Sequence, residues 1–141
     1  MGKRRKARET VMSYLYQTSI TKSLELPSDE FWKDADVDKE VKTFATKILT
    51  PAIANKEHID VLIQKYALHW KIERIASVDL AILRSAIAEM LYVPSTPAVV
   101  VIDEAVEIAK KFSTPDSGGF VNGILDKIKH EVVDTDASGK T

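Results

Sequence analysis

The sequence predicts an all-α protein, a compact bundle of about six to seven helices in two packed halves that share one core. Apolar residues recur at helical spacing along most of the chain, and proline-containing connectors separate the periodic segments. The 141 residues are 45% hydrophobic and 29% charged, a composition typical of soluble globular proteins. We expect one domain over residues 1–133, with a basic arm at 1–8, and a disordered tail over 134–141, where no apolar residue is larger than Ala137.

The first half of the chain contains several predicted helical segments. One helix is expected over residues 4–19, because an apolar stripe recurs there at positions i, i+4, i+7, i+8 and i+11. Its members are Ala7, Val11, Tyr14, Leu15 and Thr18. Ser28 is a suitable cap for a short helix through Phe31 and Trp32. Residues 37–68 are again helical in pattern, but Pro51 predicts a break or kink, because proline lacks an N–H and disfavours helical geometry at the preceding residue.

Three further helices are predicted in the second half. One covers residues 72–91. Residues 99–102 are all β-branched and have strand propensity. Their apolar pattern nevertheless continues at helical spacing through Phe112, and Pro97 suits a helix start, so we expect a helix here. The last helix contains residues 120–128 and is expected to be capped by Asp116 or Ser117.

The charge is unevenly distributed, although the net charge is only −1. Five cations lie in the first eight residues, namely Lys3, Arg4, Arg5, Lys6 and Arg8. The rest of the chain carries 15 basic against 21 acidic side chains. The sequence therefore combines a concentrated basic arm with an acidic body, which favours a polyanionic partner for the arm.

The sequence contains no arrangement of residues typical of an active site. It has no cysteine, and none of His58, His69 and His130 follows a glutamate by three residues, as in di-iron bundles. The acidic residues after position 102 are explained by a helix start, where they favour the macrodipole. There is no nucleophile elbow and no phosphate-binding glycine loop. We expect neither an enzyme nor a metal site or cofactor, and the absence of a long apolar run indicates a cytoplasmic protein without a membrane span.

The arm opposes a local rule, because cations at a helix N-terminus face the positive end of the macrodipole. On a helix, Arg8 and Tyr16 would lie along one face beside the buried stripe, and Arg5 would extend that face. Guanidinium groups can neutralise phosphates while a tyrosine ring stacks on an unpaired base, which suits single-stranded RNA. A solvated tail, with Tyr16 at the edge of the core, explains the same residues equally well.

Four sequence blocks, in order, resemble the NusB family of bacterial transcription antitermination factors. The first is Arg4-Arg5-Lys6-Ala7-Arg8-Glu9 with Leu15-Tyr16-Gln17, and the second is the stretch from Ile75 to Arg84 continued by Ala88-Glu89-Met90. The third runs from Ile102 to Phe112, and the fourth joins Asp116-Ser117 to the stretch from Phe120 to Asp126. Together the blocks extend from about residue 4 to residue 128.

The resemblance implies an all-helical protein that binds the boxA element of nascent RNA, notably in ribosomal RNA leaders. Such proteins act with NusE, which is also a small-subunit ribosomal protein, and with other Nus factors help RNA polymerase read through terminators. It also implies RNA contacts for two groups of residues, the arm with its tyrosine and the turn before the last helix: Arg4, Arg5, Lys6, Arg8 and Tyr16, and Asp116 with Phe120. Arg84 and Glu89 form either a buried structural ion pair or a partner contact.

The chain departs from the family pattern at Gly119 and Leu80, where a basic residue is usual. The change at Gly119 removes one phosphate partner from the expected surface. Two other readings remain: an RNA-binding module such as that at the N-terminus of ribosomal RNA cytosine methyltransferases, and a helical protein-interaction module that binds no RNA. The free protein could also form a homodimer that masks its RNA surface.

Overall fold

The computed structural model describes residues 2–23 and 25–134, and over these residues the protein contains seven α-helices and no strand. The helices are α1 (Lys3–Thr21), α2 (Asp29–Ala35), α3 (Lys39–Ala54), α4 (Lys56–Tyr66), α5 (Ser77–Tyr92), α6 (Ala98–Phe112) and α7 (Ser117–Ile128). A short 3₁₀ turn, η1 (Ile72–Arg74), precedes α5, and a π-helical turn, η2 (Lys129–Val133), follows α7. The predicted all-α fold is confirmed.

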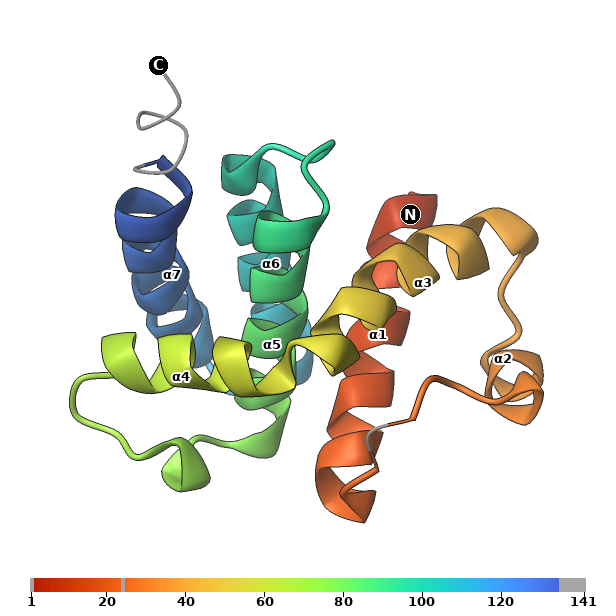
Figure 1. Cartoon of the computed structure of the whole chain (residues 1–141), viewed down its shortest axis with the longest axis horizontal. Helices are drawn as coiled ribbons and strands as arrows, with labels where there is room; N and C mark the ends of the chain where they lie inside the picture. The colour runs from red at the N-terminus through yellow and green to blue at the C-terminus, as the bar shows by residue number, and fades with distance from the viewer. Residues whose placement is uncertain (1, 24, 135–141) are drawn as a thin grey trace.

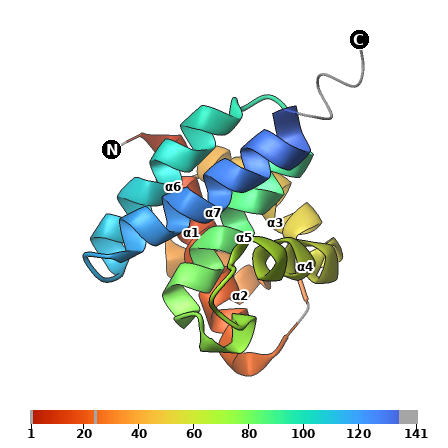
Figure 2. The same ribbon diagram turned by 90° about the vertical axis from the view of Figure 1, so that its left-hand side faces the viewer.

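The helices form two groups that meet at α5. Helices α1, α2 and α3 lie on one side, and α4, α6 and α7 lie on the other side with α5 (Figure 1). Helix α5 packs against α1 and α3 of the first group and against α6 and α7 of the second. A view at right angles shows α5 in the midst of the other helices (Figure 2). One cluster of buried apolar side chains extends from Ala7 in α1 to Ile128 in α7, so both groups share a core.

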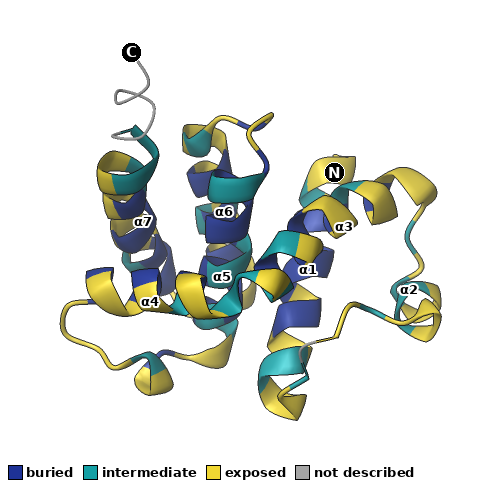
Figure 3. Ribbon diagram, in the orientation of Figure 1, coloured by how far each residue is buried: buried dark blue, intermediate teal, exposed yellow. Residues whose placement is uncertain are grey.

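Burial follows the predicted periodicity. The inner faces of α1, α5 and α7 are buried, whereas α2 contains no buried residue (Figure 3). Ser28 caps α2 as expected, since its hydroxyl accepts a hydrogen bond of 3.3 Å from the Phe31 N–H. Residues 98–112 are helical despite their β-branched start, because burial of Val101 and Ile102 requires helical spacing.

Three local predictions are wrong. Pro51 does not break its helix, which continues one turn further and ends at Ala54, whereas a kink at Pro51 stays a prediction. The helix ends where the backbone of Asn55 leaves helical geometry, at φ −115° and ψ 25°, and both the N–H and the side-chain amide of Asn55 donate to the Pro51 carbonyl, at 2.9 Å each. Residues 72–91 do not form one helix, since α5 begins only at Ser77. Neither Asp116 nor Ser117 caps α7 with its side chain.

The remaining expectations concern the histidines, a membrane span and the C-terminal tail. His58, His69 and His130 are all exposed, as expected of surface histidines. Within the described residues no helix is long and apolar enough to cross a membrane. The predicted disordered tail lies outside the described residues, except for Asp134.

Candidate nucleic-acid interface

The basic arm forms the first two turns of α1. This helix has no side-chain cap and no acidic residue in its first turn, so nothing there offsets the positive end of the helix dipole. Carboxylates from other helices approach the cations instead. The ammonium group of Lys3 lies 3.1 Å from Asp38 and 3.4 Å from Glu40, at the start of α3. Arg5 donates two hydrogen bonds to the carboxylate of Glu104 in α6.

Arg8 lies inside the protein. Only 7% of it is exposed, and its Nε and Nη2 atoms donate to the carboxylate of Glu89 at 2.8 and 2.7 Å. A third nitrogen, Nη1, is 3.5 Å from Glu104. Arg8 was expected on a face beside the buried stripe, where it would contact RNA phosphates. That face is buried at Arg8 and Met12 and exposed only at Tyr16, so Arg8 does not lie on the surface.

The structure also shows the partners of Glu89 and Arg84. Each takes part in a structural ion pair, but with a residue other than the one considered from the sequence. Glu89, which is 1% exposed, pairs with Arg8. Arg84 donates two hydrogen bonds to Asp60 of α4, at 2.8 and 2.9 Å. The first pair joins α5 to α1 and the second joins it to α4, so both hold α5 against neighbouring helices.

The pair formed by Arg5 and Glu104 shifts the titration of both groups. Hydrogen bonds from the Arg5 guanidinium hold the pKa of the Glu104 carboxyl below its usual range, although partial burial opposes the shift. The Glu104 carboxylate in turn raises the pKa of Arg5. Lys3 and Asp38 behave similarly, and the pKa of Asp38 is lowered first by the Val41 N–H that it caps. The arm is therefore partly neutralised by the protein's own acids.

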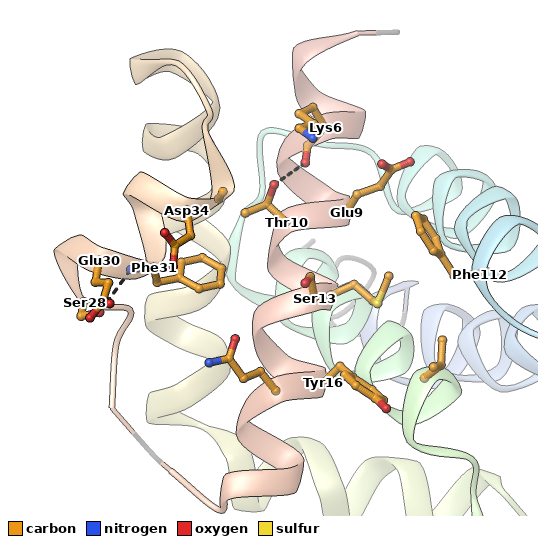
Figure 4. A pocket seen from close by; sticks show the side chains of 14 residues that line it. Lys6, Glu9, Thr10, Ser13, Tyr16, Ser28, Glu30, Phe31, Asp34 and Phe112 are labelled. Atoms are coloured by element: carbon orange, nitrogen blue, oxygen red, sulfur yellow. Dashed lines mark hydrogen bonds between the residues drawn. The ribbon is translucent and has the colours of Figure 1, made fainter.

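Two cations of the arm keep no carboxylate partner within the part of the chain that the structure describes. The guanidinium of Arg4 lies 4.8 Å from the centroid of the Phe44 ring, and Lys6 is exposed on the next turn. Lys6 and Tyr16, which is 38% exposed, line one open groove along α1, with Tyr16 two to three turns after Lys6 in the helix. Figure 4 shows the α2 residues Ser28, Glu30, Phe31 and Asp34 on one side of α1 and Tyr16 on the other. Phe112, at the end of α6, also lines this groove.

The turn between α6 and α7 is held on the first turn of α5. The hydroxyl groups of Ser113 and Ser117 donate to the two oxygens of Asp79, at 2.7 and 3.0 Å. Asp116 is thereby exposed beside a fixed backbone, while Phe120 is half-buried against the core. A second groove is lined by Arg5 together with Pro115 and Gly119 of this turn. The structure thus brings Arg5 and the turn to one groove, and Lys6 and Tyr16 to another.

Comparison with known proteins gives a consistent result. The sequence profile described as the NusB family matches residues 5–130. The chain belongs to the NusB family. It is 44% identical to the transcription antitermination protein NusB of Koribacter versatilis (strain Ellin345), over 93% of this chain and 91% of that protein. The corresponding protein of Thermodesulfovibrio yellowstonii is 41% identical, over 93% and 94% of the two chains.

Solved structures of this family have the same fold. The structure of T. maritima NusB matches with a TM-score of 0.80 and 36% identity, over 91% of each chain. A chain from a crystal structure of the antitermination factors NusB and NusE in complex with dsRNA matches with a TM-score of 0.76 and 28% identity, over 89% of this chain and 95% of that one.

The two departures from the NusB pattern have different surroundings. A Cβ at Gly119 would have no other heavy atom within 4 Å, so the position has room for a side chain. With glycine here, the groove lacks the cation that is usual at this position in the family. Leu80 is half-buried and packs against the core. A leucine in place of the usual basic residue therefore removes a positive charge and adds an apolar contact with the core.

Two residues of this region were not identified from the sequence. Asp79 fixes the turn, and Glu104 binds both Arg5 and Arg8. Their partners lie 34 to 99 positions away, so no local spacing indicates the contacts. Within the described residues no group of three or more potential ligands could hold a metal ion.

Proposed function

We propose that this protein is a transcription antitermination factor that binds boxA-type single-stranded RNA in nascent ribosomal RNA leaders together with NusE. In this role it acts in the cytoplasm and, with RNA polymerase and other Nus factors, supports reading through terminators. The observation that carries the proposal is the groove along α1, which is lined by both the unpaired Lys6 and the exposed ring of Tyr16. The antitermination proteins among its relatives support it.

Each residue of the surface has a distinct part in this proposal. Arg4 and Lys6 neutralise phosphates, whereas Arg5, whose charge is already balanced by Glu104, offers the RNA only its remaining N–H donors. Tyr16 stacks on an unpaired base. Asp116, just before α7, and Phe120, in its first turn, contact the RNA. Arg8 supports α1 from within, so it positions the surface and touches no nucleotide.

NusE supplies affinity that the protein lacks alone. The acidic body repels RNA, and its own carboxylates neutralise Lys3, Arg5 and Arg8. Few cations are therefore left for phosphates. The solved complex of a relative with NusE and dsRNA supports a shared site. Free protein that self-associates through α1 would hide this surface, and sedimentation velocity across a concentration series measures that directly.

Fluorescence anisotropy tests the proposal. The ligands are a boxA-type RNA, a scrambled RNA of equal length and a duplex of the same sequence, each with and without NusE. We expect selective binding of the single-stranded boxA-type RNA, tightened by NusE. Lys6→Ala and Tyr16→Ala should weaken it by about five- to tenfold each, because a base stacked on an aromatic ring contributes about 1–3 kcal/mol.

Lys127→Ala is the matched control, since Lys127 is exposed at the far end of α7 and its loss changes the net charge equally. A folded protein that binds none of these RNAs, even with NusE, would contradict the proposal and favour a helical protein-interaction module. Tighter binding to the duplex than to the single strand would also contradict it. The antitermination proteins found as relatives favour this function over that of a methyltransferase RNA-binding module.

A further inference from the structure

The segment between α4 and α5 presents an aromatic ring among cations. Trp70 is 53% exposed, and it is flanked in sequence by His69 and Lys71, which are exposed as well. Arg74 follows in η1, and Lys65 precedes in the last turn of α4. The ten residues from 65 to 74 contain three permanent cations and a single carboxylate, that of Glu73. This is a local excess of positive charge on a protein whose body is acidic.

These cations are not neutralised by the protein itself. Among the described residues, Lys65, Lys71 and Arg74 form no ion pair, and Lys65 lies only over the ring of Tyr66, 5.2 Å from its centroid. In α1, by contrast, Lys3, Arg5 and Arg8 all bind carboxylates. The segment therefore has three cations without a carboxylate partner, whereas in the basic arm only Arg4 and Lys6 lack one.

The segment is also held in place. The side-chain amide of Gln64 donates to the Trp70 carbonyl and accepts from the Ile72 N–H, at 2.9 Å each. The Arg74 N–H donates to the Lys71 carbonyl at 2.8 Å, which closes the η1 turn. Ile72 packs against the core. Because the backbone on both sides of Trp70 is fixed, the main chain of the segment needs little reordering when a ligand binds.

The segment continues the surface of α1. It loops below α4 and returns to the start of α5 (Figure 1). Val78, in the first turn of α5, lines the groove that holds Tyr16. Glu73 and Ser77 line another groove together with Ser19, near the end of α1. A strand whose base lies on Tyr16 and that passes the start of α5 therefore comes to Glu73, which is next to Arg74 in η1.

We propose that Trp70, Lys71 and Arg74 form a second contact for single-stranded RNA, which holds nucleotides beyond those bound along α1. The indole stacks on an unpaired base while Lys71 and Arg74 neutralise the phosphates beside it. Uncompensated cations around the ring favour a polyanion over a protein partner. This inference rests on the proposed function, because the same RNA must occupy both contacts.

Extended RNAs test the second contact. The probes are the boxA-type RNA alone and the same RNA lengthened by about eight unstructured pyrimidine nucleotides at its 5′ end or at its 3′ end. We expect one of the extended RNAs to bind the wild-type protein about tenfold more tightly than the short RNA. Trp70→Ala should remove this gain and leave binding of the short RNA unchanged, while Trp70→Phe should retain most of it.

The cations have a separate test. The double variant Lys71→Ala/Arg74→Ala should reduce the slope of log affinity against log salt by about 1.4 on the extended RNA, at about 0.7 per phosphate contact. Lys47→Ala/Lys127→Ala is the matched control, since both residues are exposed cations outside the proposed path. Circular dichroism confirms that each variant is folded.

Tryptophan fluorescence gives an independent readout. Trp32→Phe leaves Trp70 as the only tryptophan of the chain. Its emission should be quenched by the extended RNA and unaffected by the short one. If the short RNA binds but extension changes neither affinity nor emission, this inference is overturned and the proposed function stands. Quenching by NusE without RNA would likewise overturn it, whereas failure of both RNAs to bind would refute the proposed function itself.

Discussion

Single residues of the arm differ in role although they share a charge. Arg8 is buried in a two-hydrogen-bond pair with Glu89, whereas Arg4 lies on the surface over Phe44. We expect Arg8→Ala to lower the free energy of unfolding by about 3–5 kcal/mol, because it leaves the Glu89 carboxylate unpaired in the core. Urea unfolding followed by circular dichroism measures this. Arg4→Ala, the control, should change it by no more than about 0.5–1 kcal/mol.

The double variant Arg8→Met/Glu89→Leu separates pairing from packing. Removal of both charges should recover most of the stability lost in Arg8→Ala, since no buried charge is then left alone. An Arg8→Ala protein as stable as the wild type, but unable to bind RNA, would show instead that Arg8 contacts the ligand.

Glu104 should make stability depend on pH in a defined direction. Arg5 lowers the pKa of its carboxyl in the folded protein. The resulting stabilisation is present above the ordinary glutamate pKa of about 4.3, and it is lost as pH falls through the folded-state value. The difference in stability between wild type and Glu104→Gln should therefore be largest near neutral pH and shrink in acid. Urea unfolding at several pH values tests this, with Glu107→Gln on the same helix as control. A difference that stays constant from neutral to acidic pH would contradict the assignment.

At the scale of elements, Asp79 couples α5 to the turn between α6 and α7. It is 8% exposed and accepts from both Ser113 and Ser117. Asp79→Ala should cost about 1.5–3 kcal/mol of stability, because hydrogen bonds to a charged group are lost and two hydroxyls are left without their acceptor. Hydrogen exchange at residues 113–118 should speed up more than exchange in α3. Asp126→Ala, an exposed change in α7, is the control, and uniform acceleration in all helices would contradict a local role.

The elements themselves were largely predictable from the sequence. Apolar periodicity located the helices, including α6, where four β-branched residues favoured a strand but burial required helical spacing. The ends were harder. The helix that contains Pro51 continues for one more turn and ends at Asn55, not at the proline. Ser117 does not cap α7 with its side chain, contrary to the prediction from the sequence. Its hydroxyl donates instead to Asp79, 38 residues away, and the local sequence does not indicate so distant a partner.

The same distinction applies to the candidate site. Sequence reasoning found the cations of α1 and Tyr16, since charge and aromatic spacing are visible in one segment. It could not distinguish buried Arg8 from exposed Arg4, because the carboxylate that binds Arg8 belongs to Glu89, 81 positions away. It also passed over Trp70, whose unpaired neighbours stand out only after the ion pairs of the other cations are known.

At the scale of the whole molecule, ion pairing determines how much of the arm's charge an RNA encounters. Five cations lie in the first eight residues, but three of them bind the protein's own carboxylates. If those pairs persist, a short RNA confined to α1 meets only Arg4 and Lys6. If the RNA displaces the carboxylates, it also contacts Lys3, Arg5 and Arg8.

Salt dependence distinguishes these cases. With about 0.7 per phosphate contact on a single strand, two cations predict a slope of log affinity against log salt near −1.4, whereas all five predict about −3.5. We expect the smaller slope for the short boxA-type RNA and the protein alone, measured by anisotropy over a series of salt concentrations. Gly119→Lys, which restores a cation at an open position beside Arg5, should steepen it by about 0.7 and tighten binding at low salt. A slope near −3.5 in the wild type would mean that RNA breaks the pairs of Lys3, Arg5 and Arg8, and α1 would then have to shift away from α5 to release its buried arginine.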